Sequence, residues 1–189
     1  MRYTATFSLI FIFLCSATLF GQKYLNSDDM LVQTEWHGVT FRSDKSLMEN
    51  LAMAPNFAET GIILEDFQEK LFAEGEMYTV FVSVDASYMA LPEEKYKELF
   101  SAGDQLERFF KLYVVPGRLD SYSLKTAIEK NKGAVRLKTI GNEDLGVKEE
   151  NGALLLFDSN QNVATITDAN FYHSQGFFHI IDGLVFPSE

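Results

Sequence analysis

Cysteine is almost missing from this sequence, since Cys15 is the single copy among 189 residues. It lies in an uncharged apolar run, Ser8 to Phe20, which follows Arg2 and is too short to span a bilayer comfortably. This arrangement predicts a secretory signal peptide over residues 1–21, with cleavage before Gln22. Lipidation of Cys15 is the alternative, and the large residues just before it disfavour that alternative. Once the signal peptide is removed no cysteine remains, so we expect the exported protein to fold without a disulfide.

Basic side chains are also scarce, because 16 Lys and Arg residues stand against 27 Asp and Glu, for a formal net charge of −11. This balance disfavours binding to nucleic acid or to anionic lipid. No second apolar run of membrane length follows the predicted signal peptide, so we expect no membrane insertion after its removal. We expect a secreted protein, extracellular, at the cell surface or in the periplasm, whose single domain is large enough to bury its own core.

Familiar catalytic motifs are missing as well, including the G-x-S-x-G elbow, phosphate-binding glycine loops and H-E-x-x-H. The three histidines are His37, His173 and His179, and a triad would need Ser83 and Asp85 as the nearest conceivable partners. Nothing in the sequence places these groups at hydrogen-bonding distance. The histidines also lack the acidic or thiol neighbours that zinc sites favour. We therefore expect a protein that is not an enzyme and has no cofactor or metal, with a hydrolase as the less favoured alternative.

One segment imitates a calcium-binding loop. Asp158, Asn160 and Asn162 occupy its first, third and fifth positions, but Val163 and Ala169 stand where a glycine and a glutamate are expected. Asn and Asp are also the residues that a hairpin between two strands uses, so the sequence favours a turn.

Helical periodicity dominates the first half of the chain and strand patterning the second, which predicts the α+β class, with an antiparallel-rich sheet and helices at one side. A first helix is expected after a cap at Ser43 or Asp44, and Asp85 is expected to cap a short helical turn. The other helices are expected at 59–75, 92–103, 104–113 and 123–133. Strands are expected at 78–84, 134–140, 145–149, 153–158, 162–167 and 176–186.

Three motifs occur in a fixed order along the chain: TVFVSVDASYMALP at 79–92, LYVVPGRL at 112–119 and SQGFFHIIDGLVFP at 174–187. Together they resemble the fasciclin (FAS1) domain family over residues 40–187. The positions that carry this resemblance are Thr79, Val80, Phe81, Asp85, Val115, Pro116, Gly117, Gly176, His179, Asp182 and Pro187.

The resemblance implies a single FAS1 domain over residues 40–189, preceded by an N-terminal extension over 22–39. It implies a wedge-shaped β-sandwich with several flanking α-helices. It also implies a non-catalytic adhesion or matrix-binding module, whose partner is a protein or polysaccharide of the extracellular matrix or cell envelope. The alternative is a binding protein for a small apolar ligand or a polysaccharide.

Two departures from the family pattern fall at positions where partner contacts are expected. Leu112 and Tyr113 stand where the family has Tyr-His, which argues against an integrin-type contact. Asn170 and Phe171 stand where an Asp-Ile element is usual. With the next two residues, which we expect at an accessible loop end, the candidate partner-binding residues are Leu112, Tyr113, Asn170, Phe171, Tyr172 and His173.

His179 belongs to a strand that is apolar on both faces, so we expect its ring to be buried. A buried imidazole needs partners for its nitrogens. Asp85, Ser87 or nearby backbone are the expected partners.

Overall fold

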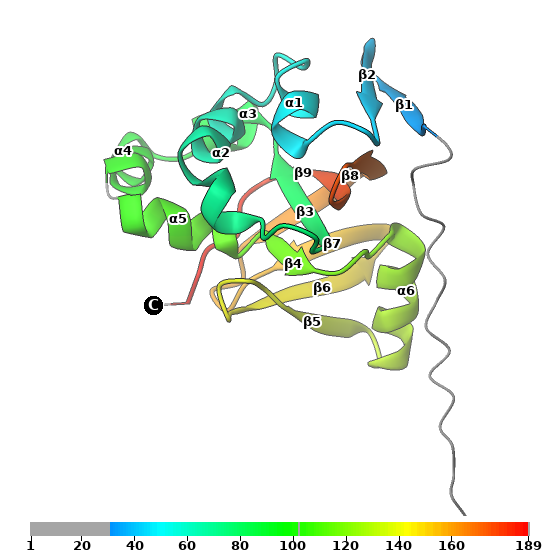
Figure 1. The fold of residues 1–189 in the computed structure, drawn as a ribbon. Helices are drawn as coiled ribbons and strands as arrows, with labels where there is room; N and C mark the ends of the chain where they lie inside the picture. Colours follow the sequence, from blue (N-terminus) through cyan, green and yellow to red (C-terminus); the bar gives the residue numbers. More distant parts are fainter. Residues whose placement is uncertain (1–30, 102, 189) are drawn as a thin grey trace, which may run out of the picture.

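The computed structural model of the protein describes residues 31–101 and 103–188. The predicted signal peptide and Cys15 lie outside these residues. In the described part, a seven-stranded sheet, a separate two-stranded hairpin and six helices form the fold (Figure 1). A search of the same residues finds no helix with the length and apolar character needed to cross a membrane.

The helices, in chain order, are α1 (Leu47–Leu51), α2 (Ala58–Leu71), α3 (Asp85–Met89), α4 (Glu93–Ser101), α5 (Gly103–Lys111) and α6 (Ser121–Lys130). The strands are β1 (Gln33–Trp36), β2 (Val39–Arg42), β3 (Tyr78–Ser83), β4 (Val114–Pro116), β5 (Ala134–Lys138), β6 (Asp144–Glu150), β7 (Ala153–Phe157), β8 (Val163–His173) and β9 (Gly176–Asp182). The α+β class is therefore confirmed.

The large sheet has the order β4-β3-β9-β8-β7-β6-β5, and only β3 and β9 pair in parallel. Its two ends approach each other, because the N–H of Ile140, just after β5, donates to the oxygen of Val114 in β4 at 2.9 Å. The sheet thus curls toward a closed barrel. In Figure 1, α1 to α5 gather at one side of it, while α6 lies beside β5 and β6.

The core is centred on β3 and β9, which carry the first and third sequence motifs. Every residue of β3 is buried, as are all residues of β9 before Asp182. Such continuous burial is expected of a strand pair covered on both faces, and it explains why the two segments are nearly all apolar.

The β1–β2 hairpin spans the expected boundary between residues 39 and 40. Trp36 from β1 and Phe41 from β2 both belong to the core cluster, and their rings stack at 5.9 Å. The part of the expected extension from Gln33 onward therefore packs with the domain.

The start of α1 differs from the sequence prediction. Its N-cap is Ser46, whose Oγ accepts from the N–H of Glu49, while the Glu49 carboxylate accepts from the N–H of Ser46. This reciprocal pair is a capping box. Ser43 instead accepts from the N–H of Val32 at 3.0 Å, and Asp44 pairs with Arg42, so both expected caps have other roles.

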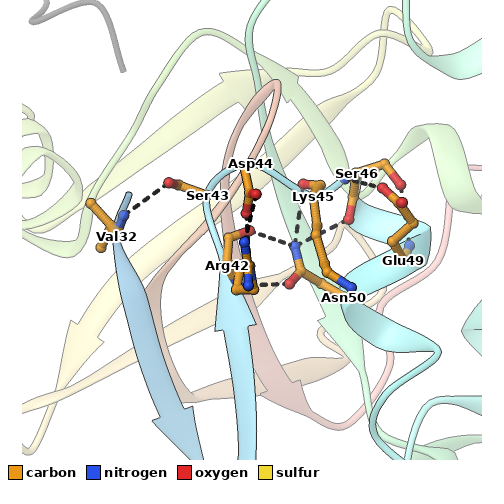
Figure 2. Close-up of polar contacts among 8 residues, drawn as sticks. All are labelled: Val32, Arg42, Ser43, Asp44, Lys45, Ser46, Glu49 and Asn50. Carbon is orange, nitrogen blue, oxygen red and sulfur yellow. Dashed lines mark hydrogen bonds and ion pairs between the residues drawn. The ribbon is translucent and has the colours of Figure 1, made fainter. Parts of the chain in front are cut away.

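A buried asparagine organises the loop between β2 and α1 (Figure 2). Asn50 accepts from the N–H of Arg42 at 2.8 Å and donates to the main-chain oxygens of Arg42, Lys45 and Ser46. The oxygen of Lys45 also accepts from the N–H of Ser174, in the turn between β8 and β9, at 2.7 Å. Asn50 thereby fixes a loop that is itself attached to the third motif.

Several element boundaries also differ from the prediction. Helix α2 ends at Leu71 rather than at 75, and β9 ends at Asp182 rather than at 186. Gly103 was expected to end a helix, but it begins α5, and α4 ends earlier at Ser101. Strand β8 runs to His173 because irregularities in its pairing with β9, between Ile166 and Phe171, let it continue past the expected end.

Candidate functional site

The three sequence motifs meet around the segment that follows the Pro-Gly turn. Thr79 in β3 donates from its Oγ1 to the oxygen of Gly117 and accepts from the N–H of Leu119, both at 2.8 Å. Gly117 has a φ of +95°, a backbone conformation that glycine adopts without strain. The first motif therefore fixes the exit of the turn that the second motif forms.

His179 from the third motif holds the same segment from the other side. Its Nε2 donates to the oxygen of Leu119 at 2.8 Å, and its Nδ1 accepts from the N–H of Asn170 at 3.2 Å. Because a carbonyl can only accept, these two bonds fix the tautomer with its proton on Nε2. The ring also stacks on Phe81 at 5.4 Å.

Burial of His179 lowers its pKa to about 4. The imidazole is therefore neutral at neutral pH, and main-chain groups occupy both of its nitrogens. Its burial and its backbone partners agree with the sequence prediction, whereas the side-chain partners proposed for it, Asp85 and Ser87, were wrong. In this arrangement His179 has no free nitrogen to exchange a proton with a substrate.

Asp85 caps a helix other than its own. Its carboxylate accepts from the N–H groups of Ala58 at 3.0 Å and Glu59 at 2.9 Å, at the start of α2. In α3, by contrast, the N-cap residue is Val84, with no side-chain cap. The prediction that Asp85 caps its own helical turn was wrong, because α2 presents its free N–H groups to the same carboxylate.

Ser87 and Asp182 form a small polar cluster at the end of β9. The Ser87 Oγ accepts from the N–H of Gly183 at 2.8 Å and lies 3.5 Å from Oδ1 of Asp182. Ser83 donates to the oxygen of Gly183. None of these serines bonds to a histidine in the described part of the chain, so no serine triad is assembled there.

Asn170 connects β8 to α6. Its backbone φ is +68°, and its side chain accepts from the N–H of Ser121 at 2.7 Å and donates to the Ser121 Oγ at 2.8 Å. Asp120 is the N-cap residue of α6, and its carboxylate accepts from the N–H of Ser123. The first turn of α6 is thus held rigidly against the irregular part of β8.

Four of the six candidate partner-binding residues are buried: Leu112, Tyr113, Phe171 and His173. The accessible loop end expected at residues 172–173 was therefore a wrong prediction for His173. The reason is the unexpected length of β8, which turns Phe171 and His173 inward, where Phe171 stacks on Phe178 at 5.2 Å. Tyr113 is fixed by its hydroxyl, which donates to the oxygen of Val185 and accepts from its N–H.

His173 lines a cavity of about 250 Å³ between α1, α2 and the β8–β9 turn. Its Nδ1 accepts from the N–H of Gln175 at 3.3 Å, and burial lowers its pKa to about 4. It is therefore a neutral core histidine, about 4% exposed.

Asn170 and Tyr172 keep part of their surface exposed. Tyr172 packs on Phe177 at 4.6 Å, and the guanidinium of Arg118 lies over both rings, 5.9 and 5.0 Å from their centroids. Nearby, Tyr122 follows directly after Ser121 and is 77% exposed. We call Arg118, Tyr122, Asn170 and Tyr172 the tyrosine surface.

Tyr122 was missed by the sequence analysis, although a signal for it was present. The buried residues of α6 are Leu124 and Ile128, four positions apart. Tyr122 precedes Leu124 by two residues, which places it on the opposite face of the helix. An aromatic residue on a solvent face is the pattern that could have identified it.

The calcium-like segment is a turn. Asp158 accepts from the N–H groups of Asn160, Asn162 and Phe186 and from the Asn162 side-chain amide. Its oxygens are thus used within the fold, as the turn interpretation predicted. More generally, among residues 31–101 and 103–188, no three His, Cys, Asp or Glu side chains gather where a metal ion could bind.

Comparison with known proteins gives three similarities. A fasciclin domain model matches residues 56–187. Protein sll1483 of Synechocystis sp. is 30% identical over 124 residues, which cover 65% of this chain and 61% of that protein. A FAS1 domain pair from the insect cell adhesion molecule fasciclin I has the same fold, with a TM-score of 0.65 and 16% identity, over 85% of this chain and 64% of that one. The chain thus spans less than two thirds of the length of these two proteins, and the FAS1-type α+β fold is confirmed.

Proposed function

This chain belongs to the fasciclin domain family, and from that membership we propose that it is a non-catalytic adhesion or matrix-binding module that works outside the cell. Its predicted signal peptide supports export. The observation that carries the non-catalytic part is the environment of His179, whose two ring nitrogens are both bonded to the main chain. A side chain held in this way stabilises the fold. We therefore expect the partner to bind to surface residues and not to His179.

We place the partner contact on the tyrosine surface. Tyrosine and arginine are frequent among the residues that dominate binding energy at protein interfaces, because they bring large contact areas on few rotatable bonds. Tyr122 is the most exposed of the large apolar side chains in the described residues. The bonds between Asn170 and Ser121 hold the two elements of this surface in one arrangement, so little conformational freedom is lost on binding.

The partner we propose is a protein or polysaccharide of the extracellular matrix or cell envelope. The acidic chain, with its net charge of −11, disfavours nucleic acid and anionic lipid as partners. The exposed tyrosine rings suit either a protein or a sugar face, so the experiment includes both.

The test is a binding assay with the immobilised full chain against cells, matrix proteins and envelope polysaccharides. We expect saturable binding to one of them, weakened about tenfold or more by Tyr122→Ala, in line with the truncation of a dominant interface residue. Met89→Ala is the matched control, since Met89 is 73% exposed but lies on α3, outside the tyrosine surface. Absence of saturable binding to every member of the panel would contradict the proposal, and equal losses in the two variants would contradict its location.

A further inference from the structure

A cleft on a different part of the molecule is lined by aromatic and charged residues that do not belong to the tyrosine surface. It has a volume of about 340 Å³ and lies between α4, α5, the 160–162 turn and the C-terminal segment 186–188. Figure 1 shows that C-terminal segment passing beside α5. The volume is at the lower end of the range of small-molecule sites in proteins.

The floor of this cleft is apolar and aromatic. Phe109 and Phe186 meet there with their ring centroids 5.6 Å apart and their planes inclined at 44°, and Leu99 lies beside them. Phe109 and Leu99 are buried, whereas Phe186 keeps part of its surface exposed. A flat apolar ring can therefore pack on Phe186, which Phe109 holds in place, since aromatic pairs prefer inclined or offset packing.

The C-terminal wall of the cleft is held in place by hydrogen bonds. Arg108 donates from Nε to the Glu143 carboxylate at 2.8 Å and also donates to the main-chain oxygen of Ser188. The N–H of Ser188 donates to the same carboxylate at 2.9 Å. The wall is therefore formed before any ligand arrives, and the charge of Arg108 is already paired.

The rim of the cleft includes one basic side chain, Lys95, that forms no ion pair among the described residues. Lys95 lies on α4 at the edge of the cleft, whereas its neighbour Lys97 pairs with Glu93. The side-chain amides of Gln105 and Asn160 complete the rim. These groups can donate to an anion placed above the aromatic floor.

The charged side chains that line this cleft can be compared with those of two other cavities. Its lining holds Lys95 and one acidic side chain, Glu98, besides Arg108, whose charge Glu143 already balances. The cavity beside His173 is lined by one acidic side chain and no basic one. A cavity of about 270 Å³ beside β5 and residues 142–144 has more acidic than basic side chains in its lining. Lys95 is therefore the group in this cleft that can attract a negatively charged ligand.

We propose that this cleft is a binding site for a small aromatic carboxylate or sulfonate, with its ring on Phe186 and its anionic group at Lys95. This site goes beyond the adhesion function and is independent of it. The ligand class follows from two features that coincide here, the partly exposed ring of Phe186 and the ammonium of Lys95, for which the described residues show no ion pair.

The experiment is a titration of the full chain with 2-naphthoate, followed by ¹H–¹⁵N NMR. We expect saturable shifts confined to residues 95–109, 160–162 and 186–188. Lys95→Gln weakens binding about threefold to fivefold, the scale of one exposed charge interaction. 2-Naphthalenemethanol, which lacks the charge, binds the unchanged protein more weakly by a similar factor. Lys97→Gln, on the same helix but outside the cleft, leaves the affinity unchanged.

A second variant tests whether the ligand binds in this cleft, by filling the cleft with a large side chain. Gln105 is exposed on α5, so Gln105→Trp leaves the core intact and places an indole over the cleft. Its melting curve checks that it is folded, and loss of naphthoate binding is the expected result. The proposal is overturned if naphthoate produces no saturable shifts at millimolar concentration, if the shifts map elsewhere, or if Lys95→Gln and Lys97→Gln bind it equally.

Discussion

His179 and Leu119 are joined by a hydrogen bond of 2.8 Å between Nε2 and a main-chain oxygen, which connects the third sequence motif to the second. The other ring nitrogen accepts from the N–H of Asn170, at the start of the tyrosine surface. The imidazole therefore links the core strand β9 to both segments on which the proposed partner contact depends. The imidazole acts as a structural connection between these segments.

The first prediction concerns the stability of the protein at acidic pH. Burial lowers the pKa of His173 and of His179 from 6.5 to about 4, so between these values the unfolded chain binds more protons than the folded one. The free energy of unfolding is then highest above pH 6.5 and falls as the pH drops toward 4, by up to about 3 kcal/mol for each histidine. Urea denaturation at pH 7.0, 5.5 and 4.5 measures this slope.

The matched control for the acid prediction is His179→Gln, which removes one of the two titrating rings. Its stability should depend less steeply on pH than that of the unchanged protein. A free energy of unfolding that stays constant from pH 7.0 to 4.5 would show that the rings are not held neutral.

The second prediction concerns the cap that Asp85 provides for α2. Asp85→Ala removes the acceptor for two N–H groups of the first turn, and we expect a loss of about 1–2 kcal/mol in the free energy of unfolding. Asp182→Ala is a suitable comparison, because Asp182 is exposed and its single side-chain bond, to Ser87, is long at 3.5 Å. Equal effects of the two changes would argue against the cap.

The third prediction concerns Gly176, where the main chains of β3 and β9 leave no room for a side chain. Gly176 has a φ of +138°, and a β-carbon at this position would clash with the main-chain oxygen of Tyr78. Gly176→Ala should therefore disrupt the parallel pairing of the two core strands and lower stability by about 3 kcal/mol or more, or prevent folding. Gly103→Ala, where the added carbon meets nothing within 4 Å, should leave the melting temperature unchanged or raise it.

The central parts of the fold could be predicted from sequence because their patterns are local. The apolar runs of β3 and β9, and the spacing of Ile63, Phe67 and Leu71 in α2, each predict an element with its buried face. The burial of His179 follows from the same reasoning. In these cases the identity of neighbouring residues is enough to decide the outcome.

The errors arose where a distant segment decided the structure. Asp85 caps a helix that begins 27 residues earlier in the chain, and propensity carries no information about that contact. The irregular pairing of β8 with β9 turns Phe171 and His173 into the core, which alternation alone could not reveal. Tyr122 is a different case, since its place opposite the apolar face of α6 was visible in the sequence.

The most direct test of the account is a paired measurement on His179→Gln, with stability and partner binding determined on the same sample. Loss of the imidazole, its stacking on Phe81 and its two bonds should lower the free energy of unfolding by about 2–4 kcal/mol. Binding per folded molecule, in the assay that identifies the partner, should stay within about twofold of the unchanged protein. A variant that is as stable as the unchanged protein but does not bind would contradict the account and assign His179 a direct role in function.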